Sequence, residues 1–194
     1  MTEGKRKLQK AALLHFARDG YEGASLQHIA QDAGMKKPSI YAHFKGKEEL
    51  FMSVLSQVFK EGRHRITAYF LREMDTPLEQ RLHGLFLMLQ EEYMRNRDTK
   101  FLLRMIFFPP HAVYEEVMAV IYPFLDSLEN RLVRLLKEES IRGNFVTADI
   151  RQAAVAFMTF ADGIMVELLY ENPERSRKRL DAVWPVYWKG IQCE

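Results

Sequence analysis

Apolar residues recur three and four positions apart along almost the whole chain, and this spacing restricts the possible folds more than any other feature. Such spacing is typical of amphipathic helices, whose apolar stripe faces a core. The sequence contains no run of alternating β-branched residues and no internal repeat. With 194 residues, 47% of them hydrophobic, the chain is long enough to bury a sizeable core. We therefore predict an all-α protein.

The N-terminal segment carries the signals of short helices in close succession. Apolar residues on one face predict a first helix over 8–17, which Gly20 would end. Ser25 is a good N-cap for a helix over 26–33, and Gly34 then allows a tight reversal of the backbone. A helix, a glycine turn and a second helix are the parts of a helix-turn-helix, whose second helix enters the major groove of DNA.

A third short helix, over 39–44, supplies the surface that such a motif needs. Pro38 suits its first turn, where a missing N–H costs nothing, and Gly46 ends it. The core that it shares with the preceding helix would consist of Leu26, Ile29, Ala30, Ala33, Ile40 and Phe44. Its outer face and its approach would carry Lys36, Lys37, Ser39, Tyr41 and His43. Basic and aromatic side chains at these positions suit phosphates and base edges.

The charge of the chain is unevenly distributed. Residues 1–47 contain nine Lys and Arg against four Asp and Glu, a net charge of +5, and the remainder contains 19 against 22, a net charge of −3. A compact basic module on a slightly acidic body is expected when only one end of a protein meets a polyanion. The charge distribution therefore favours nucleic acid as a partner of the N-terminal segment.

The stretch from Ser25 to Leu50 resembles the DNA-binding signature of the TetR/AcrR family of transcriptional regulators. The resemblance is carried by Ile29-Ala30, Ala33-Gly34, Ile40-Tyr41, His43-Phe44 and Lys47-Glu48-Glu49-Leu50. It covers roughly residues 5–55 in detail, and it implies a homodimer whose subunits have about nine helices. It also implies a helix-turn-helix DNA-binding domain over 1–47 and a helical ligand-binding and dimerisation domain over 48–194.

At the matching positions, the resemblance assigns Ser25 and Lys47 to phosphate contacts at helix N-termini. The residues expected to contact DNA are Ser25, Gln27, Lys36, Lys37, Ser39, Tyr41, His43 and Lys47. Lys36 and the Lys37-Pro38 pair depart from the commonest pattern of the family, which bears on the target sequence rather than on DNA binding itself. Whether the lysines contact phosphates or guanine bases stays open at this point.

Beyond residue 47 the helical pattern continues in longer segments. One helix is expected from Lys47 past Gly62 toward Phe70. The capping box Thr76-Pro77-Leu78-Glu79 predicts the start of the next, and Asp98 is expected to cap a further helix that ends near Pro109-Pro110.

The C-terminal part predicts three more helical segments. The segment 111–142 contains Pro123, which predicts a kink or two abutting helices, and Gly143-Asn144 would end it. The segment 148–172 is apolar on several faces, so it needs cover on more than one side. The last helix, roughly 177–191, carries its apolar residues in one stripe that could meet a partner.

Methionine and aromatic residues in this part could line an adaptable apolar pocket or simply fill the core. The candidate ligand-binding residues are Met88, Tyr93, Phe107, Tyr114, Met118, Tyr122, Met158 and Phe160. A break at Pro123 could open space for a ligand. We expect a lipophilic effector rather than a sugar phosphate, whose anion would require clustered arginines.

The last two helices are the expected dimer interface. Its candidate residues are Phe157, Ile164, Leu168, Trp184, Tyr187 and Trp188. Asp162 and Glu167 interrupt an otherwise apolar helix, and each must reach the surface or meet a cation. We expect both to be exposed.

Several classes of protein are disfavoured. The single cysteine, Cys193, cannot form an intrachain disulfide or a paired-thiolate site, which favours a reducing cytoplasm. No stretch approaches the roughly 18 uncharged apolar residues of a membrane-spanning helix, and the N-terminus lacks the apolar core of a signal peptide. The histidines form no i, i+4 pair, so we expect neither a metal ion nor a cofactor, and no membrane association.

The sequence thus predicts a cytoplasmic regulator that represses transcription and releases a palindromic operator when its effector binds. An enzyme is disfavoured, because there is no glycine-rich phosphate loop, nucleophile elbow or His-Glu-x-x-His motif. A ligand-independent DNA-binding or helical interaction protein is the remaining alternative, in which the C-terminal part only dimerises. An interior without a cavity would favour that alternative.

Overall fold

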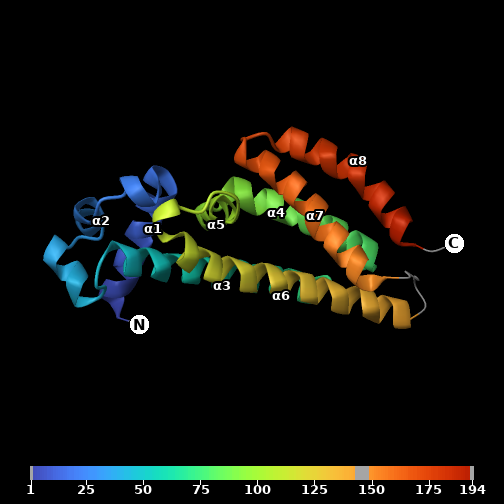
Figure 1. The fold of residues 1–194 in the computed structure, drawn as a ribbon, viewed down its shortest axis with the longest axis horizontal. Coiled ribbons are helices and arrows are strands. Elements are labelled where there is room, and N and C mark those ends of the chain that lie inside the picture. The colour runs from blue at the N-terminus through green and yellow to red at the C-terminus, as the bar shows by residue number, and fades with distance from the viewer. Residues whose placement is uncertain (1, 143–148, 193–194) are drawn as a thin grey trace. The chain divides into compact units, whose positions relative to one another are not determined.

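The structure is a computed structural model that describes residues 2–142 and 149–192. Over these ranges its regular structure consists of eight α-helices and two short 3-10 helices, without a strand (Figure 1). This confirms the predicted all-α class. The predicted helix end at Gly143-Asn144 and the residue Cys193 lie outside the described residues.

Contacts between Cα atoms divide the chain into two compact units. The first unit is Met1–His64 with Asn96–Tyr122, and the second is Arg65–Arg95 with Pro123–Glu194. Two long helices, α3 (Lys47–Arg72) and α6 (Tyr114–Ile141), begin in the first unit and end in the second. The limits of these two compact units do not coincide with the predicted domain boundary after residue 47, so that boundary stays a prediction.

The first unit has a core formed by its N-terminal helices and by segments that follow later in the chain. Its elements are α1 (Glu3–Gly23), α2 (Leu26–Asp32), η1 (Lys37–Ala42), the start of α3, α5 (Arg97–Phe107), η2 (His111–Val113) and the start of α6. Phe51 lies at its centre, with ring centroids 4.9 Å from Phe16 and Tyr21 and 6.1 Å from Phe101. Aromatic residues of α1, α3 and α5 therefore form one cluster in the core of this unit.

The second unit is built around α4 (Leu78–Arg95), α7 (Ile150–Leu169) and α8 (Pro173–Ile191). Helices α7 and α8 run side by side in opposite directions (Figure 1). Aromatic rings from all three helices pack together, with Phe86 5.2 Å from Phe157 and Phe160 4.9 Å from Tyr187 between centroids. The Tyr187 hydroxyl donates to the Ala153 carbonyl at 3.0 Å, and burial raises the pKa of Tyr187. This cluster is the core of the second unit.

Contrary to the sequence expectation, one helix within the described residues, α7, is long and apolar enough to cross a membrane by length and composition alone. In the structure it packs against α4 and α8, and the same composition is required of a core helix that is covered on more than one side.

Two predicted caps are wrong, although the helices that they mark are present. Helix α4 begins at Leu78, and the N–H of Arg81 donates to the Pro77 carbonyl at 3.0 Å, so Pro77 occupies the cap position. The Thr76 hydroxyl donates to Glu73 instead. At the start of α5 the cap is Asn96, whose side chain accepts from the N–H of Asp98 at 3.4 Å. Capping residues near a helix start compete, and propensity alone does not rank them.

Pro123 lies inside α6, which continues from Tyr114 to Ile141 as one helix. Of the two arrangements that the proline left open, the structure therefore excludes two abutting helices.

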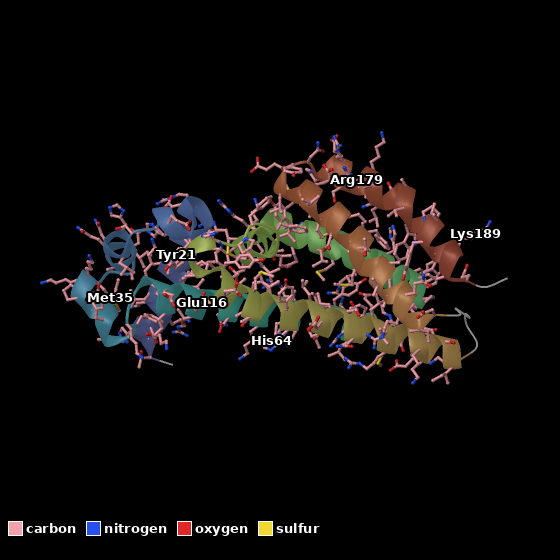
Figure 2. The ribbon with its side chains drawn as sticks, viewed as in Figure 1. Tyr21, Met35, His64, Glu116, Arg179 and Lys189 are labelled. Atoms are coloured by element: carbon pink, nitrogen blue, oxygen red, sulfur yellow. The ribbon has the colours of Figure 1, made fainter. Side chains whose placement is uncertain are left out.

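Glu167 is buried, contrary to the sequence expectation, whereas Asp162 is exposed as expected. Glu167 is 4% exposed, and its two carboxylate oxygens lie 2.6 Å from Nη2 of Arg179 and 3.2 Å from Nε of Arg175. Both arginines belong to α8 and remain well exposed (Figure 2 labels Arg179). The buried charge on α7 is thus neutralised from α8, and the pair of helices is linked by ion pairs as well as by apolar packing.

We expect removal of the two arginines to destabilise the protein more than removal of the carboxylate. In the Arg175→Ala/Arg179→Ala variant, Glu167 stays buried without a partner, which should lower the free energy of unfolding by about 3 kcal/mol. In Glu167→Gln the exposed arginines return to water, so the expected loss is about 1 kcal/mol. Urea unfolding of both variants measures the difference. Equal losses, or a larger loss for Glu167→Gln, would contradict the burial argument.

Candidate nucleic-acid interface

The turn between α2 and η1 has the geometry that a helix-turn-helix requires. Gly34 has φ of +71°, in the left-handed region that favours glycine. The N–H of Gly34 donates to the Gln31 carbonyl at 2.9 Å, and the N–H of Met35 donates to the Ala30 carbonyl at 2.8 Å. These two bonds form a Schellman motif, which ends α2 and turns the chain into η1. The predicted role of Gly34 is confirmed.

The recognition segment η1 is a 3-10 helix of six residues, Lys37–Ala42, rather than an α-helix. Pro38 lies in its first turn as predicted, and the N–H of Ser39 donates to the Lys36 carbonyl at 2.9 Å. Ile40 is fully buried beneath it, whereas Tyr41 on the opposite side is 56% exposed. The segment therefore has one face in the core and one face in solvent.

The exposed face of this motif carries most of the residues that the sequence singled out. Exposed side chains include Gln27, Lys36, Lys37, Ser39 and Tyr41. Among the described residues, neither Lys36 nor Lys37 forms an ion pair, so both charges are available to a polyanion. This face combines two cations, a hydroxyl, an amide and an aromatic ring, which are groups that contact phosphates and base edges.

Three other predicted DNA-binding residues are less exposed. Ser25 occupies the N-cap position of α2, but its side chain makes no capping hydrogen bond. His43 is half-buried and lies against Gly4 of α1, where the Cβ of any larger residue would come within 2.9 Å of the His43 Nε2. Lys47 donates from Nζ to the Glu22 carbonyl at 2.9 Å and lies 4.9 Å from the Tyr21 ring centroid. Lys47 thus stabilises the end of α1 in the DNA-free protein.

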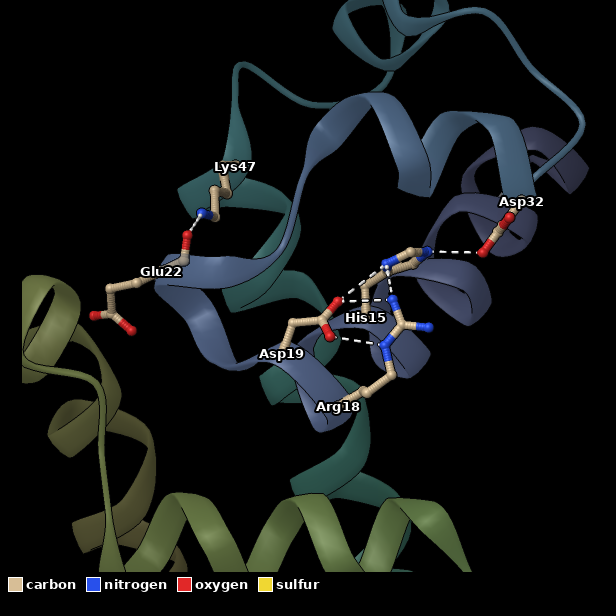
Figure 3. A network of polar contacts seen from close by, with 6 residues as sticks. All are labelled: His15, Arg18, Asp19, Glu22, Asp32 and Lys47. Atoms are coloured by element: carbon tan, nitrogen blue, oxygen red, sulfur yellow. Dashed lines mark hydrogen bonds and ion pairs between the residues drawn. The ribbon is translucent and has the colours of Figure 1, made fainter.

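A polar network that the sequence reasoning missed fixes α2 against α1 (Figure 3). His15 is 4% exposed, and its Nε2 lies 2.7 Å from the Asp32 carboxylate at the end of α2. On its other side, Nδ1 lies 3.3 Å from Nη2 of Arg18 and 3.5 Å from Asp19. The i, i+4 pair His15 and Asp19 was visible in the sequence, whereas the contact with Asp32 depends on the tertiary fold. The network orients the helix that precedes the recognition segment.

The candidate ligand-binding residues are divided between the two units. Phe107, Tyr114, Met118 and Tyr122 belong to the first, and Met88, Tyr93, Met158 and Phe160 belong to the second. Tyr93 is buried, whereas Tyr114 and Tyr122 are exposed. Phe160 lines a surface groove between α7 and α8, and Met88 lines another between α3 and α4. A shared pocket stays a prediction.

The candidate dimer-interface residues are mostly buried within the single chain. Phe157, Ile164, Leu168, Trp184 and Tyr187 are each at most 8% exposed, and Trp188 is half-buried. Of these candidates only Ile164 lines the groove on the outward face of α7 and α8, which is otherwise formed by other residues. A groove of about 530 Å³ on this face is lined by Phe160, Gly163, Ile164, Arg179, Ala182, Val183 and Val186.

Comparisons with known proteins agree with this geometry. Residues 8–54 match the family described as "Bacterial regulatory proteins, tetR family". The chain is 24% identical over its full length to the uncharacterized HTH-type transcriptional regulator YvkB of Bacillus subtilis, of which it also covers the full length.

Solved structures share the fold of the whole chain. A TetR transcription regulator from Haloarcula marismortui superimposes with a TM-score of 0.81 at 17% identity, covering all of both chains. The transcriptional regulator FadR from Bacillus subtilis, solved in complex with stearoyl-CoA, superimposes with a TM-score of 0.64 at 16% identity, covering 91% of this chain and 95% of its own. The N-terminal helix-turn-helix and the helical C-terminal part are thus those of this group of structures.

Proposed function

We propose that this chain, whose residues 8–54 match the tetR family of bacterial regulatory proteins, is a homodimeric repressor of transcription that releases its operator when a lipophilic effector binds. Proteins of this family are in general soluble cytoplasmic regulators and not enzymes, and we propose the same for this chain. The supporting observation is the exposed face of η1, where Lys36, Lys37, Ser39 and Tyr41 surround a fully buried Ile40.

The proposed operator is a palindrome. Two copies of η1 in a symmetric dimer would enter successive major grooves about 34 Å apart, one turn of the DNA helix. Each copy reads the same half-site in opposite orientation, so the symmetry of the dimer requires a symmetric sequence. Lys36 and Lys37 would supply the salt-dependent contacts to phosphates, and Tyr41 would contact a base edge or a neighbouring phosphate.

Release of the operator is proposed to follow from a shift between two conformations. Helix α3 starts at Lys47, with four residues between it and the end of η1, and continues into the second unit, so a change in its position affects both units. An effector that binds better to the conformation with the wrong spacing of the recognition segments would lower operator affinity. A coupling free energy of about 1–3 kcal/mol, typical of allosteric proteins, is sufficient.

The effector is proposed to be a small molecule with a lipophilic body. The methionine and aromatic content of the second unit supports this class, since such side chains adapt to apolar ligands. The complex of the Bacillus subtilis FadR structure with stearoyl-CoA is a precedent within the same fold for a ligand with a long apolar chain.

The Tyr41→Ala variant tests DNA binding. Purified protein is titrated, at several salt concentrations, onto the DNA upstream of its own gene and onto fragments from a genomic selection. Because a good base contact contributes about 1–3 kcal/mol of discrimination, Tyr41→Ala should weaken specific binding by about 5-fold to 150-fold. The matched control is Tyr170→Ala, a tyrosine that is 65% exposed in the second unit, which should bind like the wild type.

If no fragment of the genome is retained specifically, the repressor proposal fails. If Tyr41→Ala and Tyr170→Ala reduce specific binding equally, η1 does not contact the DNA.

A further inference from the structure

The second unit buries three charged side chains among its described residues, and only two of them have a partner of opposite charge. Glu139 is 8% exposed and pairs with Arg142 at 2.9 Å, and Glu167 is held by the two arginines of α8. Arg81 of α4 is 7% exposed, forms no ion pair with any described residue, and has an Nε without a hydrogen-bond partner. A guanidinium stays protonated in proteins, so a buried Nε–H without a hydrogen-bond partner is unfavourable.

The carboxylates of α4 and of Glu73, which follows the end of α3, do not relieve this charge. Three of them are committed to other arginines, in the pairs Glu73–Arg72, Glu91–Arg95 and Glu92–Arg65, at 2.9, 2.7 and 3.4 Å. The fourth, Glu79, is exposed and forms no ion pair within the described part of the chain. The counter-ion of Arg81 is therefore not supplied by these helices.

The backbone of Arg81 is held firmly in place. The Tyr69 hydroxyl donates to the Arg81 carbonyl at 2.8 Å, and both groups are buried. Gly84 permits this approach of α3 to α4, because a Cβ at that position would lie 2.6 Å from the Tyr69 oxygen. Burial and the neighbouring Glu73 raise the pKa of Tyr69, while Arg72 and Arg81 act in the opposite direction. The contact with Tyr69 and the close approach at Gly84 therefore fix the backbone from which the Arg81 side chain extends.

The surroundings of Arg81 favour an anion. Side chains of a helix lean toward its N-terminus, so we expect the side chain of Arg81 to lean toward the first turn of α4. The cap residue Pro77 has no side chain that could accept a hydrogen bond, and no described side chain accepts from the N–H groups of Leu78, Glu79 or Gln80. A free helix N-terminus carries a partial positive charge and adds to the attraction of the guanidinium.

An apolar strip continues from Arg81 along the same face of α4. Leu85 and Met88 follow at four and seven positions, and a helix places such residues on one side. Leu85 is buried and Met88 is half-buried. Met88 also lines the groove formed by residues of α3 and α4, which gives the apolar body of a ligand a surface to pack on.

We propose that Arg81 binds the anionic head group, a carboxylate or a phosphate, of the effector whose apolar body packs along α4. The planar guanidinium donates two parallel hydrogen bonds to such an oxyanion, which a lysine cannot reproduce. This inference rests on the proposed function, and it adds a required charge to the lipophilic effector. In this proposal the buried Nε of Arg81 destabilises the ligand-free protein and gains a hydrogen-bond partner when the anion binds.

The test uses thermal unfolding of the full-length protein with three probes of equal chain length, decanoate, decyl phosphate and decanol, below their micelle concentrations. At least one of the two anions should raise the melting temperature of the wild type more than decanol does, since a ligand of the native state stabilises it. The anion that succeeds tells a carboxylate site from a phosphate site. In Arg81→Met the dissociation constant of that anion should rise by about 10-fold to 100-fold, and Arg81→Lys should fall between.

The ligand-free variants provide a second readout. Without any probe, Arg81→Met should melt at the same or a higher temperature than the wild type, because it removes a buried donor that has no hydrogen-bond partner. The matched control is Arg131→Met, since Arg131 donates to the Thr67 hydroxyl at 3.0 Å and stacks on Phe70, and its loss should lower the melting temperature.

Three results would overturn the proposal: a marked destabilisation of ligand-free Arg81→Met, an equal response to decanol and to both anions, or an anion response that Arg81→Met retains. These measurements do not involve DNA, so they are independent of operator binding. If DNA binding depends on Tyr41 but the three probes stabilise the protein equally, the anion site is refuted and the proposed function is not.

Discussion

Replacement of Phe44 by alanine is expected to lower the free energy of unfolding by about 3–5 kcal/mol, because the ring is among the fully buried side chains of the first unit. Phe44 follows η1, its N–H donates to the Ile40 carbonyl at 2.8 Å, and Nζ of Lys5 lies 5.0 Å from its ring centroid. Loss of the ring leaves a cavity directly beneath the recognition segment. A domain of this size has about 5–15 kcal/mol of stability in total, so the effect is large.

The matched control for this prediction is Phe108→Ala. Phe108 also belongs to the first unit, but it is 55% exposed, so the same truncation should cost less than about 1 kcal/mol. Urea unfolding followed by circular dichroism gives both values. Operator binding measured well below the unfolding transition should also weaken in Phe44→Ala, since Ile40 and Tyr41 lose their support. Similar stabilities of the two variants would show that the core beneath η1 is not placed as described.

The second large effect is expected from a charge on the outward face of α7 and α8. Val186 is 72% exposed in one subunit and lines the groove between these helices. In a symmetric dimer built on this face, Val186→Glu places two carboxylates in one apolar interface, because every substitution occurs twice. Burial of unpaired charges is costly, so the dimer should dissociate.

Light scattering coupled to size exclusion measures this outcome. The wild type should have twice the chain mass of 22.8 kDa, and Val186→Glu should have the mass of one chain. Operator affinity should fall by about 100-fold or more, because two linked half-site contacts become one. Leu71→Glu, at an apolar position of α3 that is 67% exposed, is the control and should remain dimeric. A dimeric Val186→Glu protein with normal operator affinity would place the interface elsewhere.

Much of the fold could be predicted from the sequence because local chemistry restricts it strongly. Gly34 and Pro38 mark a left-handed turn and a first helical turn, and both constraints act over two or three residues. Helical spacing identified every long helix, since an apolar stripe is visible whatever covers it. The caps at Thr76 and Asp98 were predicted wrongly, because several nearby residues could serve and the surrounding chain decides among them.

The candidate site was predicted in part. The exposed positions of Lys36, Lys37, Ser39 and Tyr41 agree with their expected projection from the recognition segment. Lys47 was expected at a phosphate, and in the DNA-free protein its Nζ is bonded to the Glu22 carbonyl, a partner 25 residues away. Such a contact has no local signature in the sequence.

The sequence by itself determined the all-α class, the order of the helices and the N-terminal helix-turn-helix, because these follow from residue spacing and from residues with special backbone preferences. Only the tertiary structure decided which partner each buried group has. An apolar stripe on α7 reads the same whether its cover is the same chain or a second copy, and the structure shows Phe157, Ile164 and Leu168 covered from within. The same holds for charged residues, because pairing depends on which helices meet in space. Glu167 pairs with two arginines of α8, whereas the buried Nε of Arg81 has no hydrogen-bond partner among the described residues.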